Sequence, residues 1–84
     1  MTLVFTPHGW EDYQHWVQTD RATLTRINRL IDDALRDPFT GIGRPGQLRD
    51  VLFGAWSRRI TEEHRLVHLV DDDDLVILQA RYHY

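Results

Sequence analysis

The sequence predicts one α+β domain, with two N-terminal helices packed on one face of a small, mainly antiparallel sheet. Apolar residues recur at helical spacing in the first half of the chain, whereas the second half holds β-rich segments separated by turn-like residues. A chain of 84 residues has room for one hydrophobic core and not for a second. Helices followed by a meander of strands are typical of the α+β class, so residues 1–84 are expected to form a single domain.

A strand and a helix are expected at the start of the chain. Leu3–Phe5 is short and apolar, as a first strand would be. Thr6 and Pro7 give a helix-start signal, because a hydroxyl side chain can cap a helix and proline favours the first helical position. Residues 8–18 should form an amphipathic helix, whose apolar positions are Trp10, Tyr13, Trp16 and Val17.

A second, longer helix is expected after Asp20, whose side chain can cap it. The helix should end before Pro38, since proline disfavours helical backbone in the residue that precedes it. An apolar stripe predicts the face that packs in the core: Leu24, Ile27, Leu30, Ile31, Ala34 and Leu35. A stripe at this spacing indicates core packing rather than a ligand pocket.

The rest of the chain is expected to be a loop followed by strands. Thr40–Gln47 is rich in glycine and proline and lacks the GK[ST] ending of a P-loop, so it predicts a plain loop. Strands are expected at Ala55–Ile60, His64–Val70 and Leu75–Tyr84, and the acidic run Asp71–Asp74 is expected to be a turn. Alternation in the last strand predicts one face with Val76, Leu78, Ala80, Tyr82 and Tyr84, and another with Ile77, Gln79, Arg81 and His83.

Composition and charge exclude several classes of protein. The chain has no cysteine, so it holds neither disulfides nor thiolate metal sites. No run approaches the roughly 18 apolar residues of a membrane span, and the start lacks the basic residues of a signal peptide, so a cytoplasmic protein is expected. The net charge is −3, but residues 41–70 alone carry +2. All ten cations are arginine, which suits phosphate, although a G+C-rich genome would produce the same bias.

Arginine and aromatic side chains mark a candidate surface for nucleic acid. Such residues on a sheet can neutralise phosphates while their rings stack on bases. Because Arg59, Arg65 and His83 lie on adjacent expected strands, they could converge. The alternative is that the arginines only keep an exposed sheet face soluble. The full set is Arg49, Arg58, Arg59, Arg65, Arg81 and His83, interleaved with Trp56, Tyr82 and Tyr84.

Metal sites and acyl-transfer chemistry have little support. His64 and His68 lie four apart and would share one side of a strand, yet no third ligand and no HExxH pattern accompany them. Asp71–Asp74 lacks the alternating ligands and the glycine of an EF-hand loop. There is no nucleophile elbow. We therefore expect no metal and no cofactor.

The segment Gly54–Val67, GAWSRRITEEHRLV, closely resembles the hallmark segment of the YoeB family of bacterial toxins, within the RelE/ParE superfamily. The ending Arg81–Tyr84 is similar to the ending of that family. Further similarity at Trp10–Tyr13 and Pro38–Phe39 extends the resemblance over nearly the whole chain.

The resemblance implies a RelE-like microbial ribonuclease fold and the toxin of a type II toxin–antitoxin system. Such toxins are metal-independent endoribonucleases that enter the ribosomal A site and cut the messenger there. The ribose 2′-hydroxyl attacks the adjacent phosphate, leaving a cyclic phosphate upstream and a 5′-hydroxyl downstream. The implied partners are a YefM-type antitoxin, the ribosome with its 16S rRNA, messenger RNA, and a second copy of the chain in a homodimer.

The resemblance also implies a role for each residue that matches a functional position of the family. Arg65 matches the phosphate-stabilising arginine of the family, and His83 matches its catalytic histidine, which we assign as the general acid. Tyr84 matches a terminal tyrosine that orients substrate, and Arg59 matches an arginine near the scissile phosphate. Arg49 stands where the family usually has lysine, which keeps the charge and changes the geometry.

One position departs from the family pattern. Pro45–Leu48 stands where the family typically has Pro-Glu-Pro-Leu, so Gly46 replaces the glutamate that is the proposed general base. A general base contributes about 10²–10⁴-fold in rate. Three alternatives follow: His83 serves as the base, Asp50 or Glu63 substitutes, or the enzyme is slow or inactive.

A different class of function is compatible with the missing carboxylate. ParE-like relatives share the fold and block DNA gyrase without cutting nucleic acid, and a toxin could also block the A site without cutting. The resemblance at Trp56–Val67 and His83 favours the ribonuclease. An acidic antitoxin tail that pairs with the arginines and displaces the C-terminal tail would switch such an enzyme off.

Overall fold

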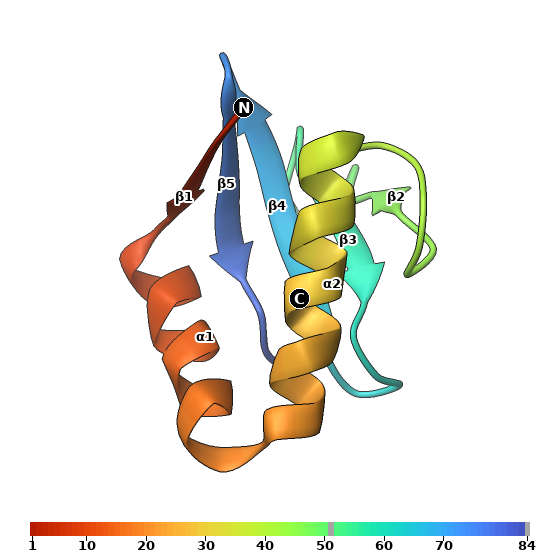
Figure 1. The fold of residues 1–84 in the computed structure, drawn as a ribbon. Coiled ribbons are helices and arrows are strands. Elements are labelled where there is room, and N and C mark those ends of the chain that lie inside the picture. Colours follow the sequence, from red (N-terminus) through yellow and green to blue (C-terminus); the bar gives the residue numbers. More distant parts are fainter. Residues whose placement is uncertain (51, 84) are drawn as a thin grey trace.

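The computed structural model describes residues 1–50 and 52–83, and within them the strands form a five-stranded sheet in the order β1-β5-β4-β3-β2. Strand β1 is parallel to β5, and the other neighbours are antiparallel. Both helices lie on one face of the sheet (Figure 1), which confirms the predicted α+β class. The elements are β1 (Thr2–Phe5), α1 (Pro7–Thr19), α2 (Arg21–Arg36), β2 (Gly46–Gln47), β3 (Trp56–Arg59), β4 (Arg65–Asp71) and β5 (Asp74–Gln79).

The predicted caps determine where the helices begin. The Thr6 side chain accepts the Gly9 N–H at 3.0 Å, with Pro7 in the first turn of α1. Asp20 ends α1 and starts α2, because its side chain accepts the Thr23 N–H at 3.1 Å. Gly9 is buried against the last strand, and a Cβ there would collide with the Ile77 carbonyl. Helix α1 can therefore approach β5 closely, near the point where the C-terminal tail begins.

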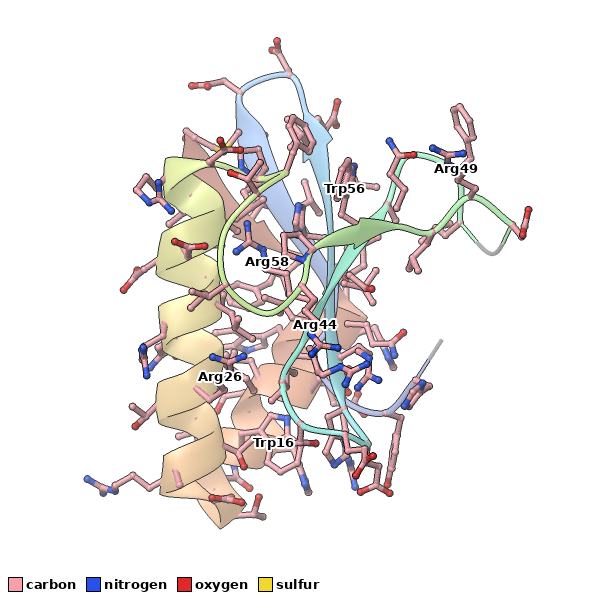
Figure 2. All side chains as sticks on the ribbon, turned by 90° about the vertical axis from the view of Figure 1, so that its right-hand side faces the viewer. Trp16, Arg26, Arg44, Arg49, Trp56 and Arg58 are labelled. Atoms are coloured by element: carbon pink, nitrogen blue, oxygen red, sulfur yellow. The ribbon has the colours of Figure 1, made fainter. Side chains whose placement is uncertain are left out.

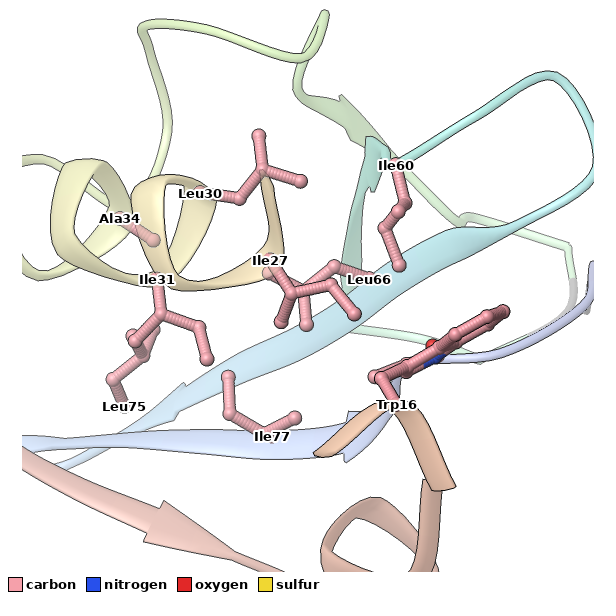
Figure 3. Close-up of a cluster of buried hydrophobic side chains, with 10 residues drawn as sticks. Trp16, Ile27, Leu30, Ile31, Ala34, Ile60, Leu66, Leu75 and Ile77 are labelled. Atoms are coloured by element: carbon pink, nitrogen blue, oxygen red, sulfur yellow. The ribbon is translucent and has the colours of Figure 1, made fainter. Parts of the chain in front are cut away.

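The main core fills the space between the helices and the inner face of the sheet, as Figure 3 shows. The predicted stripe of α2 supplies much of it, with Ile27 and Leu30 fully buried. A second, smaller core lies on the other face and joins Leu48, Ala55 and Val67. The members of the main core are Trp16, Ile27, Leu30, Ile31, Ala34, Ile60, Leu66, Leu75, Ile77 and Ala80.

The prediction of a last strand reaching residue 84 is wrong. Strand β5 ends at Gln79, and Tyr82 adopts a positive φ of 63° that no strand contains. Ala80 packs in the main core with Ile77, rather than sharing a face with Leu78. The register of β4 and β5 shifts near Val67, so simple alternation fails at this end of the sheet.

Two smaller expectations also need correction. Asp71 and Asp74 are paired residues of β4 and β5, so the turn is confined to the two residues between them; Asp71–Asp73 are exposed at the tip, and Asp74 is half-buried. Gly46 and Gln47 form the edge strand β2 within the expected loop, pairing with Ser57 and Trp56. No helix in the described ranges is long and apolar enough to cross a membrane.

Candidate active site

The two faces of the sheet carry different arginines. Side chains alternate along a strand, so Arg58 and Arg59 point to opposite faces. Arg58 pairs with Leu66 of the main core and therefore faces the helices. Arg59 pairs with Arg65 across β3 and β4, and both lie on the face away from the helices. We call this the outer face; it also includes Gly46, Ser57 and Val67.

Arg65 is held in a fixed position by the turn between β3 and β4. Its side chain is buried to 9% exposure, and one terminal nitrogen donates to the carbonyls of Thr61 (2.6 Å), Glu62 (3.0 Å) and His64 (3.0 Å). A guanidinium fixed in this way needs no rearrangement to meet an anion. The turn thus places a cation at one end of the outer face.

The same turn holds the C-terminal tail. The His83 Nε2 lies 3.1 Å from the Glu62 carbonyl oxygen. The Tyr82 N–H donates to His64 Nδ1 at 2.8 Å, and the Tyr82 carbonyl accepts from the Arg65 N–H at 3.1 Å. Arg65 and His83 both contact the Glu62 carbonyl, so the structure brings them together at one end of the sheet. Arg59, which pairs with Arg65 across β3 and β4, lies at the same end.

Helix α1 fixes the point where the tail leaves β5. The Trp16 indole donates to the Ala80 carbonyl at 2.7 Å, and Asp12 Oδ2 accepts the Ala80 N–H at 3.0 Å. Asp12 and Trp16 are both buried. On the other side, the Gln79 amide donates to the carbonyls of Arg81 (2.9 Å), Tyr82 (3.3 Å) and His83 (3.2 Å). Sequence reasoning placed Trp16 on the apolar face of a helix and Gln79 on a strand, and it linked neither of them, nor Asp12, to the tail. The contacts of Trp16 and Asp12 could not be foreseen locally, because they join residues 64 and 68 positions apart.

The expectation that Arg58 binds phosphate is wrong. Its side chain is 0% exposed on the inner face, where Figure 2 shows it between α2 and the loop after it. One terminal nitrogen donates to Asp33 Oδ2 at 2.6 Å and to the Ile42 carbonyl at 3.1 Å; the other donates to Asp37 and Thr40 carbonyls, each at 2.8 Å. Hydrogen bonds from Arg36 and then Arg58 hold the pKa of Asp33 well below its usual range.

Of the other predicted arginines, Arg49 lies apart from this turn, and Arg81 lies in the tail beside Tyr82. Arg49 follows β2 and donates to Gln47 Oε1 at 2.8 Å; Figure 2 shows it at the far end of β3. Gln47, the partner of Arg49, pairs with Trp56 at the start of β3. Arg59 lies at the end of that strand, about 10 Å further along. Arg81 lies with its guanidinium carbon 4.6 Å from the centroid of the Tyr82 ring. Tyr84 lies outside the described residues.

Position 46 is open. A Cβ built on Gly46 would meet no heavy atom within 4 Å, so a larger side chain has space on the outer face. Of the carboxylates considered as substitutes, Asp50 lies in the exposed loop that follows Arg49. Glu63 lies in the β3–β4 turn, where its carboxylate is 3.2 Å from His64 Nε2.

Two further arginines border Arg59 and were not singled out from the sequence. Arg26, on α2, donates to the Arg59 carbonyl at 3.1 Å. The Arg59 N–H donates to the Gly43 carbonyl at 2.7 Å, and the exposed Arg44 follows with a positive φ of 53°. Figure 2 labels both residues, which extend the basic surface beside the outer face. The sequence signal that pointed to a role for Arg44 was the net positive charge of residues 41–70.

The two histidines of the metal hypothesis have different surroundings. His64 contacts the tail, whereas His68 is fully buried on the inner face. Burial, aided by the nearby Arg58 charge, lowers the pKa of His68 to about 4. Within residues 1–50 and 52–83, no group of three or more His, Asp or Glu side chains is placed to hold a metal ion.

The chain is similar to known bacterial toxins over its full length. A family model described as the YoeB-like toxin of bacterial type II toxin–antitoxin systems matches residues 5–84. Toxin YoeB of Streptomyces coelicolor is 60% identical over 84 residues, covering 100% of both chains. A solved YoeB/ParE toxin from Agrobacterium tumefaciens superposes with a TM-score of 0.96 at 45% identity, covering 100% of both chains. YoeB of Staphylococcus aureus, solved as a dimer, gives 0.91 at 40% identity over 100% of this chain and 98% of that one; its complex with YefM gives 0.90 at 39% identity with the same coverage.

Proposed function

The chain belongs to the family of YoeB-like toxins of bacterial type II toxin–antitoxin systems, and on that premise we propose that it is a ribosome-dependent, metal-independent endoribonuclease. The substrate is messenger RNA in the ribosomal A site, and the consequence of cleavage is inhibition of translation. The observation that carries the proposal is the β3–β4 turn, which holds the Arg65 guanidinium and the His83 imidazole side by side.

The proposed reaction is an internal transfer at the scissile phosphate. The ribose 2′-oxygen attacks phosphorus, the bond to the 5′-oxygen breaks, and a cyclic phosphate and a 5′-hydroxyl remain. Arg65 offsets the negative charge that gathers on the phosphorane, with Arg59 as a second cation. His83 donates a proton to the leaving 5′-oxygen. Because Arg65 is fixed before substrate arrives, little reorganisation is needed in the transition state.

The reaction also requires a base that accepts the proton of the 2′-hydroxyl. Gly46 offers no carboxylate. Asp50 directly follows Arg49, which Figure 2 shows beyond Trp56 at the start of β3, whereas His83 contacts Glu62 in the turn at the end of β3. The remaining acceptors are Glu63 in the turn and His83 itself. Either would serve less well than a dedicated carboxylate, so we expect cleavage to be slower than a glutamate at position 46 would allow.

We propose three kinds of partner. The structures of S. aureus YoeB with YefM and as a dimer support a YefM-type antitoxin and a second copy of the chain as partners here. The ribosome, through its 16S rRNA, would present the messenger. The basic surface formed by Arg59, Arg44 and Arg26 is suited to RNA phosphates.

The absence of a side chain at Gly46 supports a second candidate function, a toxin that binds its target without cutting. The test is to place a defined messenger in purified ribosomes and map its ends with the wild type and with His83→Ala. We expect cuts within the A-site codon that require ribosomes and disappear in the variant. Stalled translation on uncut messages would overturn cleavage and identify an A-site blocker; DNA damage in cells would identify a gyrase inhibitor.

A further inference from the structure

The C-terminal tail contains a backbone conformation that needs support. Tyr82 has a φ of 63°, in the left-handed region that tyrosine rarely adopts. Such conformations persist only where surrounding contacts determine them, and they often lie at functional sites. The next residue is His83, so the conformation of Tyr82 decides where the His83 imidazole lies.

Two consecutive residues of the β3–β4 region hold both backbone groups of Tyr82. Its N–H donates to the Nδ1 atom of His64 at 2.8 Å. Its carbonyl accepts from the backbone N–H of Arg65 at 3.1 Å. The side-chain bond from His64 is the one of the two that a substitution can remove.

The imidazole of His64 is itself held on three sides. Its centroid lies 4.8 Å from that of Trp16, in an edge-on contact, and 5.4 Å from that of Tyr82. The ring is 12% exposed, and its Nε2 lies 3.2 Å from a Glu63 carboxylate oxygen. A backbone N–H can only donate, so Nδ1 must carry a lone pair and the proton must reside on Nε2, facing the carboxylate.

We propose that His64 is a positioning residue of the cleavage reaction. Its Nδ1 lone pair holds the Tyr82 backbone in the left-handed conformation and thereby places His83 against the Glu62 carbonyl, beside Arg65. His64 acts through the tail and touches no reacting atom. The inference rests on the proposed ribonuclease function for its kinetic consequence, while its geometric part can be measured without RNA.

Two substitutions distinguish the role of the His64 Nδ1 acceptor from that of the His64 aromatic ring. His64→Phe keeps an aromatic ring between Trp16 and Tyr82 and removes the acceptor. His64→Asn loses the ring and keeps an oxygen at the position of Nδ1. A matched control is His15→Phe, since His15 also contacts the Trp16 ring edge-on, at 4.8 Å, and lies in α1.

The kinetic test is single-turnover cleavage of a defined messenger on purified ribosomes. We expect His64→Phe to lower the cleavage rate about 10- to 100-fold with unchanged ribosome affinity, because a small displacement of a catalytic group has effects of this size. His64→Asn should recover most of the loss, and His15→Phe should cleave like the wild type. A folded His64→Phe that cleaves at the wild-type rate, or a His64→Asn as slow as His64→Phe, would overturn the proposal.

An NMR measurement on the RNA-free protein tests the geometry alone. The ¹⁵N shifts of His64 should show the tautomer with its proton on Nε2, and the Tyr82 amide should exchange slowly with solvent. In His64→Phe that amide should exchange about tenfold faster or more. A proton on Nδ1, or equal exchange in both proteins, would contradict the proposal. If the wild type cuts no message but shows the expected tautomer and protection, the ribonuclease function fails while the positioning contact stands.

Discussion

The inner and outer faces of the sheet use the same residue types for different purposes. On the inner face, Arg58 and His68 are fully buried, and Arg58 bonds to the loop after α2. On the outer face, Arg65 is fixed by carbonyls of the β3–β4 turn, and the exposed His83 contacts the same turn. The difference shows that the face, and not the residue type, separates the structural arginines and histidines from the proposed catalytic ones.

Neighbouring arginines on β3 give the largest expected contrast. Arg58→Met removes a fully buried guanidinium with its ion pair to Asp33 and its bonds to carbonyls of the loop after α2, and it should lower the free energy of unfolding by about 3–5 kcal/mol. Arg59→Met removes an exposed side chain and should change that free energy by less than about 0.5 kcal/mol. Urea unfolding of both variants measures the difference. Equal losses would mean that burial does not separate the two roles.

The arginines of the outer face should differ in what they do to RNA. Arg65→Gln should lower the single-turnover cleavage rate about 10²–10³-fold, since a fixed donor to the transition state is lost. Arg49→Gln should leave that rate within about threefold and instead reduce the salt dependence of RNA binding, because Arg49 lies at the far end of β3. A large rate loss in Arg49→Gln would place both arginines at the scissile phosphate.

Gly46→Glu tests whether the outer face lacks only a base. The position has open space, so the variant should fold normally and cleave at least about tenfold faster than the wild type. Gly46→Gln is the matched control without a carboxylate and should show no gain. If neither variant cleaves faster, the wild type already holds an adequate base, and Glu63→Gln becomes the substitution to measure.

The buried histidine of the inner face should affect stability rather than cleavage. The pKa of His68 is lowered to about 4 from 6.5, so the unfolded chain binds a proton at higher pH than the folded one. Its contribution is therefore fully present above pH 6.5 and is lost as the pH falls toward 4, by up to about 1.4 kcal/mol per pH unit. Unfolding of the wild type and of His68→Phe across this range gives the contribution by difference. Parallel curves would contradict it.

Local signals in the sequence were sufficient to predict the first half of the fold. Thr6, Pro7 and Asp20 specify helix ends through contacts within three residues, and Pro38 stops α2 in the same local way. The stripe of α2 predicted its buried face, because periodicity and burial are linked on a helix that packs on a sheet.

The tail and the arginines could not be predicted in the same way. Alternation along β5 continues in the sequence to its end, but contacts with Trp16 and Asp12 end the strand, and these come from the other end of the chain. The pattern also gave Arg58 and Arg59 the same role. Which side of β3 the helices cover is a property of the tertiary fold, and it alone separates those two residues.

The resemblance identified the family and the residues to compare, and the family is confirmed. It placed Arg65 and His83 in one site without showing what holds them. The structure supplies the carbonyls of the turn and the contacts of His64, Trp16 and Gln79. A sequence motif names residues, but it does not show these contacts between them.

We propose that the β3–β4 turn and the tail together form a catalytic centre for RNA. The most direct measurement is the chemistry of the ends produced from a ribosome-bound messenger by the wild type and by His83→Ala. We predict a 2′,3′-cyclic phosphate upstream and a 5′-hydroxyl downstream for the wild type, and no such ends for the variant. An uncut messenger from folded, ribosome-bound wild type, or equal cleavage by His83→Ala, would contradict the claim.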